Sequence, residues 1–114
     1  MNTRAWTFAV LQALLLATAS ADIRTVELAH EVRLADLRLP QAESGTVGYR
    51  TCDECEYQTD RVTAETRWLL NGRIVPLDDF RVSLARVADR SDVYVTVLHH
   101  LEDDRVTEVS VYLP

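Results

Sequence analysis

The C-terminal third of the chain contains two stretches in which apolar and polar residues alternate. The first covers residues 93–98 and the second residues 106–113, and a charged segment, 102–105, separates them. An alternation of period two is typical of a strand with one buried face. The pattern therefore predicts two strands joined by a turn, with the following residues facing the core: Val93, Val95, Val97, Val109, Val111 and Leu113.

Three earlier stretches are rich in Thr, Val, Trp or Tyr, which favour strands: 46–50, 57–62 and 66–70. Asn71-Gly72 follows the last of these stretches, and both residues tolerate the positive φ of a type I′ turn. The sequence therefore predicts a hairpin in which residues 68–70 fold back on residues 73–75.

A helix is predicted over residues 77–88. Pro76 ends the preceding strand, and Asp78 and Asp79 suit the positive end of a helix dipole. The apolar residues then follow one another at helical spacing, which indicates a single stripe that packs on a sheet. This stripe consists of Leu77, Phe80, Leu84 and Val87.

The N-terminal segment, residues 23–39, fits two patterns. Its apolar residues alternate with polar ones, as in a half-buried strand, but several of them also fit a helical stripe. We favour a strand over residues 32–39, preceded by a helical turn.

Together, the predicted elements indicate an α+β fold. A small, mostly antiparallel sheet or an OB-like barrel carries one helix between its third and fourth core strands, and the pattern leaves both architectures open.

Residues 1–21 have the features of a cleavable signal peptide. Arg4 gives a positive n-region, residues 8–17 an apolar core, and Ala19-Ser20-Ala21 an A-x-A cleavage site. We therefore expect a periplasmic or secreted protein with no membrane anchor after cleavage. The mature chain is then one small domain, residues 22–114, whose core is marginal enough that one covalent cross-link matters.

The charge of the chain is acidic. It has 12 basic and 18 acidic residues, a net charge of −6, and removal of Arg4 with the signal leaves 11 against 18, or −7. Nucleic acids and anionic membranes bind positively charged surfaces. We therefore expect no nucleic-acid partner, and the expected partner is an envelope protein or a small ligand. Every basic residue is Arg, which is typical of GC-rich bacterial genomes.

Cys52 and Cys55 are the two cysteines of the chain, and they form a C-x-x-C pair. A redox-active pair needs a stabilised thiolate, usually from a helix N-terminus or from nearby cations. Here Asp53, Glu54 and Glu56 place negative charge around both sulfur atoms, and the predicted helix begins far from them. We therefore predict a structural disulfide that closes a four-residue loop, with a thiol–disulfide redox pair as the alternative.

A metal site could in principle combine the two cysteines with His99 and His100 in a Cys₂His₂ set. Adjacent residues of a strand point to opposite faces, so both histidines reach one ion only where the strand ends. An oxidising compartment also removes thiolate ligands. The sequence therefore predicts no metal site, and His99 and His100 are the candidates if one exists.

The chain contains no recognisable catalytic motif. It has no G-x-S-x-G, no H-E-x-x-H and no glycine-rich phosphate loop. The Asp78-Asp79 pair is explained by its place at a helix N-terminus, and His30 is expected at the surface. We therefore predict no catalytic residues and no cofactor.

Several short motifs follow one another between residues 46 and 80. A strand precedes Cys52-x-x-Cys55, which is followed by the runs Val62-Thr63-Ala64-Glu65-Thr66 and Asn71-Gly72-Arg73-Ile74-Val75-Pro76-Leu77. This order resembles that of uncharacterised small exported proteobacterial proteins. The resemblance implies a secreted or periplasmic protein of unknown function.

These observations predict a non-enzymatic binding or interaction module. A partner is expected on a sheet edge or face, with residues 93–98 or the last strand as candidates. The alternatives are a thiol–disulfide redox protein that uses Cys52 and Cys55, or a metal-binding protein.

Overall fold

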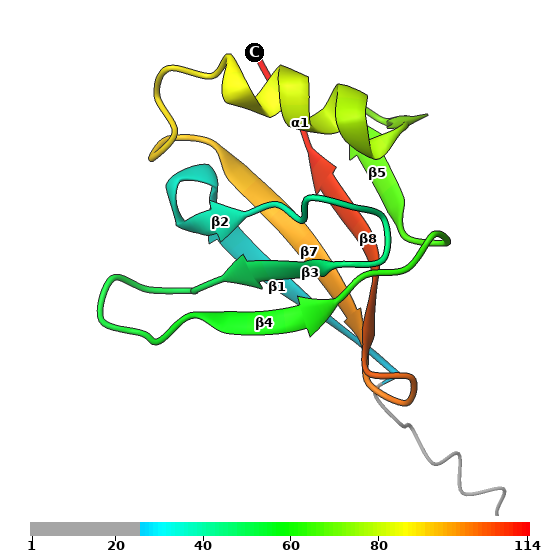
Figure 1. Cartoon of the computed structure of the whole chain (residues 1–114). Coiled ribbons are helices and arrows are strands. Elements are labelled where there is room, and N and C mark those ends of the chain that lie inside the picture. The colour runs from blue at the N-terminus through cyan, green and yellow to red at the C-terminus, as the bar shows by residue number, and fades with distance from the viewer. Residues whose placement is uncertain (1–25) are drawn as a thin grey trace, which may run out of the picture.

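Two seven-residue strands, β7 (Tyr94–His100) and β8 (Arg105–Val111), form the centre of the structure (Figure 1). The computed structural model describes residues 26–114. The two strands pair antiparallel, and the register brings inward-facing valines opposite one another. Val95 lies opposite Val111 and Val97 opposite Val109, and all four are buried. The strands predicted over residues 93–98 and 106–113 are therefore confirmed, with the first starting one residue later and extending to His100.

The other strands flank this pair on both sides. β1 (Glu27–Arg33) pairs antiparallel with β7. On the far side of β8 lie β5 (Arg67–Leu70) and β4 (Gln58–Arg61), and both run parallel to it. β6 (Arg73–Val75) extends β5, while β3 (Thr46–Tyr49) and β2 (Leu37–Arg38) follow β4. The described residues therefore form one open mixed sheet of eight strands, in the order β1-β7-β8-β4-β3-β2 with β5 and β6 as a branch on β8.

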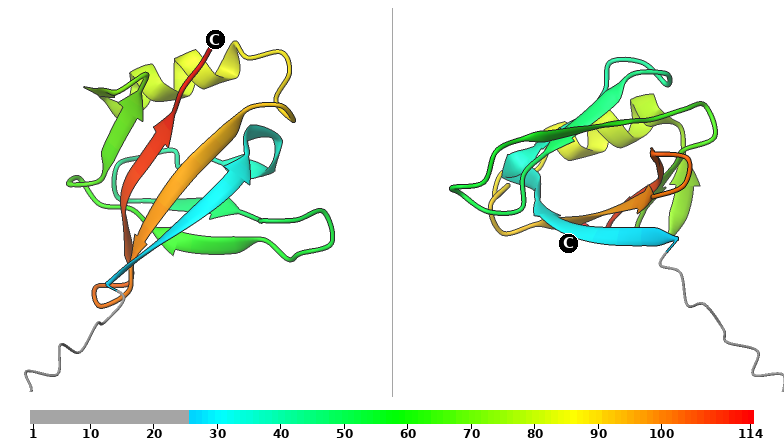
Figure 2. Two further views of the ribbon diagram at one scale, coloured as in Figure 1. Left: turned by 180° about the vertical axis from the view of Figure 1, so that it is seen from behind. Right: turned by 90° about the horizontal axis from the view of Figure 1, so that it is seen from below.

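The fold class is confirmed in its coarse form, since the molecule is mostly sheet with a single helix among the described residues. The predicted antiparallel sheet is corrected to a mixed one, because β4 and β5 both run parallel to β8. The strand pairing gives an open sheet, and no closed barrel is formed within residues 26–114. The two ends of the strand order, β1 and β2, are nevertheless consecutive in the chain, so the sheet bends back on itself (Figure 2).

The N-terminal segment has its elements in the reverse of the predicted order. β1 comes first, and the 3₁₀ turn η1 (Leu34–Asp36) follows it instead of preceding it. The amides of Leu34 and Ala35 donate to the carbonyls of Val93 and Arg90, at 2.8 Å and 3.0 Å. These bonds fix the turn where the chain leaves β1 and crosses to β2. The predicted signal peptide, residues 1–21, lies outside the described residues.

The helix α1 (Leu77–Ala85) begins at the predicted residue and lies between β6 and β7, as expected. It ends three residues before the predicted end, because the amides of Arg86 and Val87 bond to carbonyls only three residues back, as in a 3₁₀ turn. Its stripe is confirmed: Leu77, Phe80 and Leu84 are buried, and Val87 packs against the core. The Phe80 ring lies 5.3 Å from that of Trp68 in β5.

The predicted hairpin is confirmed. Asn71 and Gly72 have φ values of 52° and 83°, and Leu70 pairs with Arg73 across the turn. Asn71 also accepts a hydrogen bond from the amide of Leu113 at its Oδ1 atom, at 2.7 Å. The turn thereby fixes the end of the chain beside β5.

Candidate functional site

The disulfide loop lies between β3 and β4, and it is the first of three features that could carry a function. Cys52 and Cys55 are joined through their sulfur atoms, with their Cα atoms 5.1 Å apart. The amide of Cys55 donates to the carbonyl of Cys52 at 3.2 Å, so the loop is a tight turn closed by main-chain and side-chain bonds. The predicted pairing is therefore present, and residues 26–114 contain no free cysteine.

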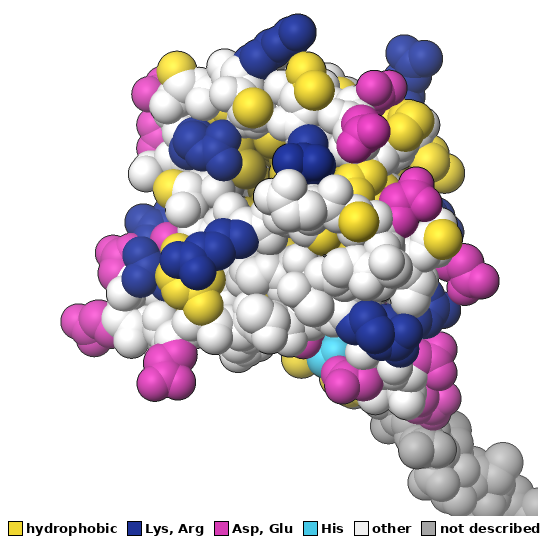
Figure 3. Space-filling model, viewed as in Figure 1, with side chains coloured by type: hydrophobic (Ala, Val, Ile, Leu, Met, Phe, Trp, Pro, Cys, Tyr) yellow, Lys and Arg dark blue, Asp and Glu magenta, His cyan; other side chains and the backbone are white. Residues whose placement is uncertain are grey.

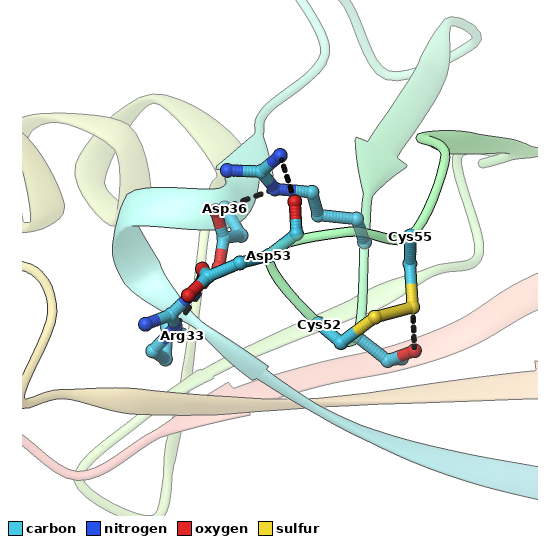
Figure 4. Close-up of a disulfide and its surroundings, with 7 residues drawn as sticks. Arg33, Asp36, Cys52, Asp53 and Cys55 are labelled. Atoms are coloured by element: carbon cyan, nitrogen blue, oxygen red, sulfur yellow. Dashed lines mark hydrogen bonds and ion pairs between the residues drawn. A yellow bond between two sulfur atoms is a disulfide. The ribbon is translucent and has the colours of Figure 1, made fainter.

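A cluster of ion pairs attaches the disulfide loop to the rest of the molecule (Figure 4). Asp36 is only 4% exposed and lies between two arginines. Arg33 Nε donates to its Oδ2 atom and Arg50 Nε to its Oδ1 atom, each at 2.9 Å. Arg33 also pairs with the carboxylate of Asp53, and Arg50 donates to the Asp53 carbonyl at 3.0 Å. Both arginines thus bridge the η1 turn to the disulfide loop.

This cluster changes the electrostatic picture of the loop that the sequence suggested. The bond from Arg50 is the largest cause that lowers the pKa of Asp36 below its usual value, and Arg33 acts in the same direction. The pKa values of both arginines are raised in turn. Of the acidic residues beside the cysteines, Asp53 is compensated by Arg33, a cation that is distant in sequence. No helix of the described residues begins at either cysteine, so the pair lacks the helix N-terminus that usually stabilises a thiolate.

A second cluster lies at the other end of β7. His99 follows Val95 and Val97 on the inward face, but it is a polar residue with a 15% exposed side chain. Its Nε2 atom lies 2.8 Å from Asp104 Oδ1 and 3.9 Å from Asp60 Oδ1. One ligand atom from each of these three residues lies within 4.8 Å of the others. In Figure 3 a histidine is visible between acidic side chains near this end of the molecule.

Tyr49 extends this cluster into the core. Its hydroxyl donates to Asp60 Oδ2 at 2.5 Å, and the residue is fully buried. Burial raises the pKa of Tyr49 well above its usual value, and the hydrogen bond to Asp60 acts in the same direction. The His30 ring lies 5.3 Å from the Tyr49 ring. His30 was expected at the surface, but it is half-buried against this cluster.

The Cys₂His₂ set considered from the sequence is not assembled. Both cysteines are in the disulfide, and His100 lies on the opposite face of β7 from His99, where its Nδ1 atom accepts the amide of Asp103 at 3.2 Å. The structure instead places His99 with two aspartates from other elements. The sequence signal for this was available, because His99 continues the inward series of Val95 and Val97 at period two.

The third feature is the outer edge of β1, which no other strand of residues 26–114 covers. The carbonyl of Val26 accepts a hydrogen bond from the amide of Leu101, and the amide of Leu34 donates to the carbonyl of Val93, both at 2.8 Å. The even-numbered residues of β1 therefore direct their main-chain groups at β7. The register is continuous, and the odd-numbered residues therefore direct theirs away from the sheet. These are Glu27, Ala29, Glu31 and Arg33.

The strands favoured from sequence as partner sites are not at an edge. β7 lies between β1 and β8, and β8 has neighbours on both sides. The outer strands are β1, with seven residues, β2, with two, and β6, with three. The second view in Figure 2 shows β1 running along the outside of the sheet.

The comparisons with known proteins gave no match: no family model, curated protein sequence or solved structure is similar to this chain. None of the helices formed by residues 26–114 is both long and apolar enough to cross a membrane.

Proposed function

We propose that this protein is an exported, non-enzymatic interaction module that binds an extended segment of a partner protein along β1. Its location is periplasmic or secreted. The A-x-A site and apolar core of residues 1–21 support export, and the Cys52–Cys55 disulfide is compatible with an oxidising compartment.

The observation that carries this proposal is the outer edge of β1. A strand with unpaired main-chain groups is a template for adding another strand, and several peptide-binding domains bind ligands in this way. β1 offers four alternate residues whose main-chain groups point outward, whereas β2 and β6 are too short to offer more than one or two. The added strand would therefore pair with residues 27–33.

The charges on β1 define the segment that fits it. Glu27 and Glu31 accept hydrogen bonds from the hydroxyls of Thr107 and Thr96, each at 3.1 Å. No ion pair among residues 26–114 involves either carboxylate. Both lie on the outer face, so basic side chains at alternate positions of an added strand would neutralise them.

The opposite face of the added strand would be apolar. Leu28 has 41% of its surface exposed and lies on the inward side of β1. Residues of the added strand that point to this side would cover Leu28. The partner is therefore an extended segment in which Lys or Arg alternates with apolar residues.

The test is titration of ¹⁵N-labelled protein with a short synthetic peptide of alternating Arg and Val, followed by NMR. The expected result is binding that shifts the amides of β1, and a matched peptide of Glu and Val should not bind. Ala29→Pro removes one outward amide without breaking a bond to β7, and it should abolish binding. Glu65→Arg, on an exposed loop, is the control variant and should leave binding unchanged.

Two outcomes overturn the proposal. The first is the absence of binding by the Arg and Val peptide to the folded protein. The second is binding that Ala29→Pro leaves unchanged, because it would then use a surface other than the edge of β1. Circular dichroism of Ala29→Pro distinguishes loss of binding from loss of folding.

A further inference from the structure

We propose that Asp60, His99 and Asp104 form a binding site for a divalent transition-metal ion of the Zn²⁺ type. This inference rests on residues other than those that carry the binding mode proposed for β1, although Leu28 of β1 lies opposite His99 in the β1–β7 register.

The three residues come from different elements that the fold brings to one point. Asp60 is in β4, His99 near the end of β7, and Asp104 in the turn between β7 and β8. Asp60 is opposite Val47 in the β3–β4 register, so it points to the same inward face. His99 reaches this face from β7, and Asp104 approaches it from the turn.

The distances are close to those that an ion needs. Four-coordinate Zn²⁺ holds nitrogen and oxygen ligands at about 2.0–2.2 Å, which places neighbouring ligand atoms roughly 3.3 Å apart. His99 Nε2 is 2.8 Å from Asp104 Oδ1 and 3.9 Å from Asp60 Oδ1. All three atoms lie within 4.8 Å of one another. Small rotations of the side chains would therefore bring them around one ion.

The chemistry of the ligands selects the ion. Imidazole nitrogen suits Zn²⁺ and its neighbours in the first transition series, whereas Ca²⁺ and Mg²⁺ prefer sets made entirely of oxygen. One imidazole and two carboxylates leave room for water in the remaining position. With a neutral imidazole, the site carries two negative charges that a divalent cation balances.

The Tyr49 hydroxyl orients the carboxylate of Asp60 from the core side of the site. It donates to Asp60 Oδ2 at 2.5 Å, which leaves Oδ1 directed at His99. Such hydrogen bonds to metal-ligating carboxylates fix their orientation, and their loss typically weakens metal binding about 10- to 100-fold. Asp60 and His99 have side chains that are only 14% and 15% exposed, so two of the three ligands are held by packing as well.

The nearby arginines do not occupy the site. Arg61 donates to the carbonyl of Asp103 at 3.0 Å, and Arg105 Nε lies 3.4 Å from the Asp103 carboxylate. Asp103 therefore pairs with the basic residues around the turn. The carboxylates of Asp60 and Asp104 have His99 as their ionic partner among the described residues.

The test is isothermal titration of the full, disulfide-bonded protein with ZnCl₂ after removal of metals with EDTA. We expect one Zn²⁺ per chain. His99→Ala and Asp104→Asn should each weaken binding at least about tenfold, and Tyr49→Phe about 10- to 100-fold. Asp104 has φ of 51°, a conformation that Asn also tolerates, so Asp104→Asn should fold normally.

His100→Ala is the matched control, because His100 is adjacent in sequence but lies on the other face of β7. It should bind Zn²⁺ as the unmodified protein does. Absence of Zn²⁺ binding by the unmodified protein overturns the proposal. Binding that persists in His99→Ala and Asp104→Asn, or that is lost equally in His100→Ala, overturns it as well.

Discussion

Arg50 and Asp36 connect two parts of the chain that are distant in sequence: Arg50 Nε donates to Asp36 Oδ1 at 2.9 Å. Asp36 ends the turn that follows β1, and Arg50 begins the loop that contains the disulfide. The amide of Arg50 also donates to the carbonyl of Asp36, at 3.3 Å. The position of the disulfide loop therefore depends on a nearly buried carboxylate and not on the disulfide alone.

We predict that this carboxylate makes stability depend on pH. The pKa of Asp36 is lowered in the folded protein from an ordinary value of 3.8, chiefly by its bond to Arg50. A group with a lowered folded pKa stabilises the protein above its unfolded pKa, and this contribution is lost as the pH falls through the folded pKa. Asp36→Asn should therefore have a lower melting temperature than the unmodified protein at neutral pH. The difference should shrink as the pH falls below 3.8, and a constant difference would contradict the prediction.

We predict that the disulfide contributes modestly to stability and has no catalytic role. Closing a four-residue loop restricts the unfolded chain by about 2 kcal/mol on the chain-entropy model, so Cys52→Ser with Cys55→Ser should lower the free energy of unfolding by about that amount. Chemical denaturation measures this loss. The reduction potential should lie below about −300 mV, as in structural disulfides. A value near −120 to −200 mV would instead indicate a thiol–disulfide enzyme.

Tyr49→Phe should destabilise the protein through a single hydroxyl group. The substitution leaves Asp60 without its buried donor, and the loss of such a bond costs about 1–3 kcal/mol. Tyr112→Phe is the control, because Tyr112 is 74% exposed and its variant should stay within about 0.5 kcal/mol of the unmodified protein. Equal free energies of unfolding for both variants would show that the Tyr49 bond contributes nothing.

Substitutions in α1 test how this helix packs on the sheet. Phe80 is fully buried against Trp68, whereas Val82 on the same helix is 51% exposed. Phe80→Ala should therefore cost about 3–5 kcal/mol in the free energy of unfolding, and Val82→Ala less than about 1 kcal/mol. Comparable losses in urea denaturation would mean that the helix does not pack on the sheet by the stripe described.

The sequence predicted the elements whose signals are local. The Asn71-Gly72 turn, the start of the helix at Leu77 and the period-two strands each depend on a few neighbouring residues, and all are present. The parallel pairing of β4 and β5 with β8 could not be predicted, because it depends on which strands meet after long connections. For the same reason, the sequence did not show that residues 93–98, one of the candidate partner sites, belong to a strand in the interior of the sheet.

For the candidate sites, too, the sequence predicted contacts between neighbouring residues and missed contacts between distant segments. The Cys52–Cys55 pair was predicted because the two residues are three apart, and a turn brings them together. The bridging arginines and the group of His99 with Asp60 were missed, since each joins residues from separate strands. The available signal was that His99, a polar residue, stands at an inward-facing position of its strand. A strand rarely places an unpaired histidine toward the core.

Amide hydrogen exchange of β1 tests the proposed binding mode most directly. In the free protein, the amides of His30 and Val32 should exchange slowly because they face β7, while those of Ala29 and Glu31 should exchange fast because they face outward. When the peptide of alternating Arg and Val is bound, exchange at Ala29 and Glu31 should slow by at least about tenfold, as for amides paired in a sheet. Exchange at Ala29 and Glu31 that stays fast in the complex would contradict the addition of a strand to β1.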